Sequence, residues 1–231
     1  GNLKHRTMEE DVWKLYDLRK DFSQSTDLAA QYPQKLEEMK ALFMQEAAAN
    51  QVLPLGGQVM GDSGLPELSK GVTSATYHAG AVGIPESALP KMANRSWSID
   101  ARLAVTPESR GVIAAVGGHQ AGWSLYLDAQ RHAVFTYRTF DVQTAVIRSA
   151  DPVAPDTHDI RVDFTYDGKG YARGGGLALS IDGKPEGTGR LVATTPHHFT
   201  IDETFDVGID RGSAVDRYPD VSPLGYPFQG R

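Results

Sequence analysis

The sequence predicts a mainly β protein in which a small strand–turn–helix unit precedes an antiparallel sandwich of two β-sheets. From Ser96 onward, short runs of alternating apolar and polar residues follow one another, and this period of two is typical of half-buried strands. Turns rich in Gly and Asp separate the runs at regular intervals, as they do in sandwich folds. No segment of helical period interrupts them, which argues against crossover helices and a parallel sheet.

The first predicted unit covers residues 1–54. Apolar and polar residues alternate over residues 12–18, which predicts a short strand, and the polar stretch that ends at Ala29 predicts a turn. We expect residues 3–6 to pair with this strand as a hairpin. A two-stranded hairpin is marginally stable alone, so the unit is expected to lean on another domain.

A helix is predicted over residues 33–49. Pro33 is tolerated in the first helical turn because its missing N–H would have no partner there. Asn50 is a favourable residue for the helix end. The apolar residues that recur at helical spacing are Leu36, Met39, Phe43 and Ala47.

The second predicted domain, residues 55–231, begins with a stretch that is rich in Gly, Pro and Ser. In this stretch, residues 71–78 are predicted to form a strand and residues 84–90 a loop with a single helical turn. The predicted strands of the sandwich are residues 97–103, 111–116, 123–127, 133–137, 142–147, 160–166, 177–181 and 205–207.

Composition excludes several classes of function. The chain has no Cys, so disulfides, thiolate metal sites and a Cys nucleophile are excluded. Its net charge of −6 is spread out, and the lack of a Lys/Arg-rich run argues against nucleic acid as a partner. No apolar run approaches the ~18 residues needed to span a bilayer, so no membrane partner is predicted.

The strand–turn–helix stretch resembles the C-terminal end of the catalytic domain in the sulfatase family, as found in arylsulfatase-like enzymes. There, a Trp-acid-Leu-Tyr-x-Leu strand precedes an acidic turn, an Asn-Leu-Ala or Asp-Leu-Ala step and a helix. The matching residues here are Trp13, Leu15, Tyr16, Leu18, Asp21, Asp27, Leu28 and Ala29. The departures are Phe22, where the family usually has Pro, and Asp27, where Asn is common. The resemblance implies that the helix over residues 33–49 buries Leu36, Met39 and Phe43 against the catalytic domain of a longer protein.

The second domain resembles the domain that follows the catalytic core in many bacterial arylsulfatases, through residues 159–168, 174–184 and 205–215. The resemblance implies a jelly-roll sandwich like those of concanavalin-type legume lectins and laminin G domains, and a periplasmic or secreted location. In that family one more strand follows the Pro-Phe-x-Gly step found here at residues 227–230, so we expect the last strand to be missing after Arg231.

The same resemblance implies no catalytic, cofactor-binding or metal-binding residue in this chain. Sulfatases of this kind use a formylglycine, made from Cys or Ser in a Cys/Ser-x-Pro-x-Arg motif, beside a calcium ion held by Asp and Asn. The chain has neither a Cys nor a Ser in such a motif. We therefore expect formylglycine and calcium to belong to a catalytic domain outside this sequence, and this chain to have no sulfatase activity.

Other polar groups are weaker candidates. His197 and His198 could bind a metal, but adjacent residues in a strand point to opposite faces, which favours simple loop polarity. The Gly-rich segments 168–170 and 174–176 lack the strand–loop–helix context of a phosphate loop and are predicted to be hairpin turns. Four aspartates could bind Ca²⁺, although their irregular spacing favours turns: Asp206, Asp210, Asp216 and Asp220.

Aromatic residues are candidates for sugar contact or for core packing. Trp97 and Trp123 alternate in phase with Ile or Leu neighbours, which predicts burial between the sheets. Tyr218 and Tyr226 lie in loops, where they could contact a ligand, although burial over a sandwich edge is the simpler expectation.

Three functions remain open. The first hypothesis is a non-catalytic accessory domain of a sulfatase that packs on its own catalytic domain and shapes substrate access. The second is a lectin-like carbohydrate-binding module, by analogy of fold alone. A glycoside hydrolase ranks last, because it needs two facing acids and the predicted strands contain no Glu. Self-association through surfaces left open at the ends of the fragment is a further expected partnership.

Overall fold

The computed structural model describes residues 11–52, 69–140, 142–218 and 225–230. The chain divides into two compact units, Gly1–Pro66 and Glu67–Arg231, which are described separately here. The boundary predicted after residue 54 falls outside the described residues, so that prediction stays open.

The first unit contains one described helix, α1 (Pro33–Ala49), and its bounds confirm the predicted helix. Pro33 occupies the first turn, and the N–H of Asn50 donates to the Glu46 carbonyl at 2.9 Å to end it. Within the described residues, no helix is long and apolar enough to cross a membrane.

The strand predicted at residues 12–18 is wrong, because this segment has no regular structure. Carboxylates organise it instead. Asp27 accepts hydrogen bonds from the N–H groups of Leu15 (3.1 Å) and Ala29 (2.9 Å). Asp21 accepts two more, from Ser25 and Thr26, and these bonds lower its pKa to about 2. The predicted partner strand, residues 3–6, lies outside the described residues.

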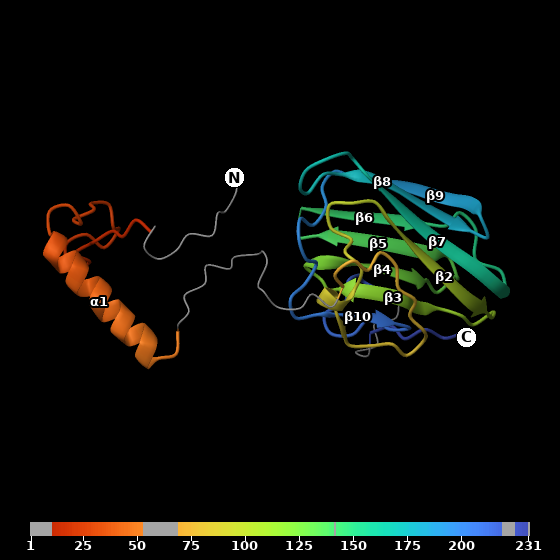
Figure 1. Ribbon diagram of the computed structural model, residues 1–231. Helices are drawn as coiled ribbons and strands as arrows, with labels where there is room; N and C mark the ends of the chain where they lie inside the picture. The colour runs from red at the N-terminus through yellow and green to blue at the C-terminus, as the bar shows by residue number, and fades with distance from the viewer. Residues whose placement is uncertain (1–10, 53–68, 141, 219–224, 231) are drawn as a thin grey trace. The chain divides into compact units, whose positions relative to one another are not determined.

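The second unit is an antiparallel sandwich of two sheets, which confirms the predicted fold class (Figure 1). One sheet has six strands in the order β1-β10-β3-β4-β5-β6, and the other has four in the order β2-β7-β8-β9. A 3₁₀ turn, η2 (Glu86–Ala88), follows β1 and confirms the predicted helical turn. The strands are β1 (Ile84–Pro85), β2 (Trp97–Val105), β3 (Gly111–Gly117), β4 (Ala121–Leu127), β5 (Ala133–Thr139), β6 (Gln143–Arg148), β7 (Asp156–Tyr166), β8 (Gly175–Ile181), β9 (Lys184–Leu191) and β10 (Thr204–Val207).

Two expectations about this unit fail. Residues 71–78 form no strand, and Tyr77 is held by a ring contact with Phe205 (centroids 4.9 Å apart) rather than by a ladder of hydrogen bonds. Strand β9 was not predicted because it contains Pro185 and two glycines and shows no apolar alternation. Those glycines are needed: a Cβ on Gly187 would lie 2.7 Å from the Ile147 side chain of β6.

The core between the sheets is built from the apolar positions that alternate in the sequence. Trp123 is 3% exposed and stacks on Phe135, with the ring centroids 6.1 Å apart. Trp97 is partly buried and packs against Phe135 and Phe164. The prediction that both tryptophans belong to the core is therefore confirmed.

The outer faces of the two sheets differ. The four-stranded sheet presents ion pairs to solvent, including Arg102 with Asp159 (2.7 Å) and Arg161 with Asp100 (2.7 Å). The six-stranded sheet carries a second apolar cluster, in which residues of the C-terminal segment lie over β3, β4 and β5. This cluster consists of Val112, Ala115, Tyr126, Val134, Val215, Tyr218 and Tyr226.

Candidate functional site

The C-terminal segment covers part of the outer face of the six-stranded sheet through its tyrosines. Tyr218 and Tyr226 are each 4% exposed and stack with their ring centroids 5.2 Å apart. Tyr126 of β4 meets the Tyr218 ring edge-on at 5.0 Å. Tyr218 and Tyr226 are thus buried, which agrees with the expectation of burial rather than ligand contact. They lie over the face of the sheet, however, and not over an edge of the sandwich.

Asp210 stabilises this covering segment, which carries Val215, Tyr218 and Tyr226, through hydrogen bonds. Its carboxylate accepts hydrogen bonds from the Val215 N–H (2.8 Å) and from the Tyr218 hydroxyl, which also lies 2.9 Å from the hydroxyl of Ser124. Burial raises the pKa of Asp210 to about 6. Burial also raises the pKa of the Tyr218 hydroxyl, and the charge of Asp210 adds to that rise.

Asp216 makes a second attachment. One carboxylate oxygen accepts hydrogen bonds from the Tyr126 hydroxyl (3.1 Å) and the Thr136 hydroxyl (2.5 Å), and the other accepts from the Arg217 N–H (2.7 Å). Burial raises the pKa of Tyr126, and the charge of Asp216 contributes further. The Arg138 guanidinium lies at the limit of an ion pair, 4.0 Å from Asp216.

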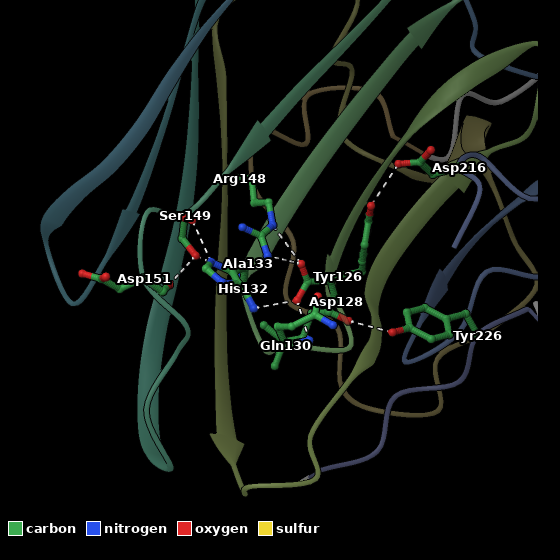
Figure 2. Close-up of polar contacts among 11 residues, drawn as sticks. Tyr126, Asp128, Gln130, His132, Ala133, Arg148, Ser149, Asp151, Asp216 and Tyr226 are labelled. Carbon is green, nitrogen blue, oxygen red and sulfur yellow. Dashed lines mark hydrogen bonds and ion pairs between the residues drawn. The ribbon is translucent and has the colours of Figure 1, made fainter. Parts of the chain in front are cut away.

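A separate polar network closes the turn between β4 and β5 (Figure 2). Asp128 accepts hydrogen bonds from the N–H groups of Gln130 and His132, both at 2.9 Å, and from the Arg148 guanidinium at 2.9 Å. The Ser149 hydroxyl accepts from the Ala133 N–H at 3.1 Å. Asp128 and Arg148 are thus engaged in contacts within the protein, and we assign both residues a structural role.

A cavity of about 210 Å³ opens beside the covered face, around the β5–β6 hairpin and the loop that precedes β4. It is smaller than the ~300–1,000 Å³ typical of sites for drug-sized ligands, and so suits one small group or ring. Its lining is polar apart from two side chains and consists of Gln120, Arg138, Phe140, Val142, Gln143 and Thr144.

Arg138 is the charged residue among the described residues of this lining. Its side chain is only 18% exposed, and its Nε–H is buried with no hydrogen-bond partner. The amide of Gln143, in contrast, is occupied: it donates to the Arg190 carbonyl and accepts from the Val192 N–H. Arg138 therefore has donor capacity that its described surroundings do not use.

Phe140 is the aromatic residue of the lining. It follows β5 with a φ of 36°, in the left-handed region that a bulky side chain rarely adopts. Its ring stays 46% exposed. An exposed aromatic ring held in a strained conformation beside a polar cavity is a feature that ligand sites share.

The other sequence candidates do not converge on one site. His198 lies 4.0 Å from Glu86, whereas the His197 ring contacts Tyr171. Asp206 accepts hydrogen bonds from the Gly83 N–H and the Thr204 hydroxyl and serves the loop around β10. Within the described ranges, no three His, Cys, Asp or Glu side chains are grouped to hold a metal ion. Asp220 lies outside those ranges.

Sequence reasoning did not identify Arg138 or Phe140. Arg138 lies in β5, just beyond the predicted strand at residues 133–137, and the alternation of β5 only places it on the polar side of the strand. Phe140 stands directly after the strand and before Val142, where an apolar residue could equally belong to the core. The signal that could have found them was an aromatic residue at a hairpin end, next to an arginine on the outward face.

Comparisons with known proteins give a likeness of fold alone. No family model and no curated protein matches this chain. The carbohydrate-binding module CBM40 of the Ruminococcus gnavus IT-sialidase, bound to α2,6-sialyllactose, matches at 14% identity and a TM-score of 0.38, over 60% of this chain and 73% of that one. A heptameric SAP-like pentraxin from Limulus polyphemus matches at 13% identity and a TM-score of 0.36, over 59% and 61%. TM-scores below 0.5 do not establish a common function, which has to be inferred from the residues of this chain.

Among its described lining residues, the cavity has no carboxylate, histidine or cysteine. What the lining provides is a cation, amide and hydroxyl groups, and a half-exposed ring.

Proposed function

We propose that the sandwich is a non-catalytic carbohydrate-binding module and that the cavity beside Arg138 is its ligand site. The observation that carries this proposal is the juxtaposition of the exposed Phe140 ring with polar groups that converge on one small cavity. A sugar ring presents an apolar face together with hydroxyls at its edge. Such a ligand needs an aromatic surface and a few placed polar groups, as small-ligand sites generally provide.

The other surfaces of the sandwich fit this role less well. The outward side chains of the four-stranded sheet that carry charge are engaged in ion pairs, such as Arg161 with Asp163. On the outer face of the six-stranded sheet, Tyr126, Tyr218 and Tyr226 are buried in the apolar cluster of the covering segment. The cavity lined by Arg138 and Phe140 combines accessibility with unused hydrogen-bonding capacity.

Phe140→Ala tests this assignment in the full chain. Loss of ring contact is expected to weaken binding to the best ligand on a glycan array roughly 2- to 12-fold, the equivalent of about 0.5–1.5 kcal/mol for an aromatic contact. The matched control is Tyr171→Ala, which removes an exposed ring elsewhere on the sandwich. If only the Tyr171 variant loses binding, the cavity is not the site.

A second function, accessory domain of an arylsulfatase-like enzyme, is favoured by the surface of α1. Met39, Leu42 and Phe43 are exposed in the first unit, although the helix was predicted to bury Leu36, Met39 and Phe43 against a catalytic core. We infer that this apolar stripe packs on a sulfatase catalytic domain encoded in the same gene. The proposal requires that the coding sequence upstream of this chain contain a Cys/Ser-x-Pro-x-Arg motif. Sequencing the gene tests this, and an upstream coding sequence that lacks the motif would contradict the proposal.

A further inference from the structure

The outward face of β5 presents a cation that its surroundings only partly satisfy. Arg138 carries five N–H donors in a rigid fork. Its Nε–H is buried without a partner, and its Nη2 reaches Asp216 at 4.0 Å, beyond hydrogen-bonding distance. A buried donor without a partner is costly. Arg138 also lines the cavity, so its guanidinium is available to an acceptor that enters there.

Asp216 is poorly placed to be that acceptor. Its two oxygens already accept hydrogen bonds from Tyr126, Thr136 and the Arg217 N–H. These bonds hold the carboxylate toward the covered part of the sheet, whereas Arg138 lines the open cavity. Asp216 therefore offsets part of the charge of Arg138 without using its donors.

The position of Arg138 is well defined by its neighbours. In the sheet register it lies between Gly122 of β4 and Thr144 of β6. Gly122 has no room for a side chain, since a Cβ there would approach the Val116 carbonyl at 2.3 Å and Val215 at 3.1 Å. On the other side, Thr144 adds a hydroxyl to the same cavity lining. Arg138 and Thr144 are therefore neighbours in the sheet that line the same cavity, with Asp216 of the covering segment 4.0 Å from the guanidinium.

We propose that this cavity selects acidic saccharides, with Arg138 pairing with a carboxylate or a sulfate ester on the sugar. This inference rests on the carbohydrate-binding function proposed above and specifies its ligand class. A planar guanidinium forms paired N–H···O bonds with such oxyanions, and the bonds strengthen where water is partly excluded. Phe140 contributes the ring contact, Arg138 selects the acid group, and Thr144 and Gln120 are available to sugar hydroxyls.

The test is a glycan array printed with matched sets, in which each backbone appears in a neutral, a carboxylated and a sulfated form. The full chain is expected to bind acidic members roughly 10- to 100-fold more tightly than their neutral counterparts, as charge-assisted hydrogen bonds imply. The preference should fall as salt is raised. The carboxylated and sulfated arms show which acid group is preferred.

Two variants make the result specific. Arg138→Gln should bring acidic and neutral glycans to equal affinity, and Arg138→Lys should retain part of the preference because it keeps the charge but loses the paired geometry. Arg102→Gln is the matched control: it makes the same change of charge on the other sheet, where Arg102 pairs with Asp159. Thermal melts of all three variants show whether each is folded.

The outcomes separate this inference from the function on which it rests. Binding to neutral and acidic glycans alike would overturn acid selection while leaving a carbohydrate-binding module. An equal loss in Arg102→Gln and Arg138→Gln would also overturn it, since attraction would then be non-specific. Binding to no glycan in any set overturns the carbohydrate function itself.

Discussion

Trp123→Ala is expected to lower the free energy of unfolding of the sandwich by about 3–5 kcal/mol. The indole is 3% exposed and packs beside Phe135 and Phe205 on the inner face of the same sheet, with ring centroids 6.1 and 6.0 Å away. Removing it leaves a large void that the two rigid sheets cannot close. Urea denaturation followed by far-UV circular dichroism measures the change.

The control for this experiment is Val192→Ala, which shortens an exposed side chain and should change stability by less than ~0.5 kcal/mol. A Trp123 variant that unfolds like the parent but has lost glycan binding would contradict the core assignment. Trp123 would then be part of a binding surface.

The second large effect is a dependence of stability on pH that comes from Asp210. Its pKa rises from 3.8 to about 6 on folding because the carboxyl is buried, with Asp206 and Glu203 adding like charge nearby. The folded protein therefore retains a proton that the unfolded chain releases. The contribution is full below pH 3.8, is lost as the pH rises through about 6, and amounts to about 3 kcal/mol.

Asp210→Asn should remove this dependence, because an amide cannot ionise but can still accept the hydrogen bond from Val215 or Tyr218. Free energies of unfolding measured in urea at pH 4, 5, 6 and 7 should fall more steeply for the parent than for the variant. Parallel curves for the two proteins would show that Asp210 does not titrate in this range. If the free energy of unfolding depends less on pH in the Asp210→Asn variant than in the parent, Asp210 is the group that weakens the attachment of the covering segment near neutral pH.

Local patterns determined the elements that are defined by their own residues. The helix at residues 33–49 follows from its apolar spacing, Pro33 and Asn50, and its bounds agree with α1. The strands that alternate strongly, such as β2 and β7, were predicted because each buries one face. The same signal failed at residues 12–18, where carboxylates satisfy the backbone, and at β9, where glycines make room for Ile147. The sulfatase resemblance, which rests on short motifs, stays a prediction.

The sequence by itself determined the class of fold, the helix and which faces of most strands are apolar, because these depend on neighbours two to four residues apart. Only the tertiary structure decided which polar residues meet. Arg138 and Asp216 are far apart in the chain, and the segment that carries Asp216, Tyr218 and Tyr226 folds back over β4 and β5. The meeting of these residues depends on packing between distant segments, which no local pattern encodes.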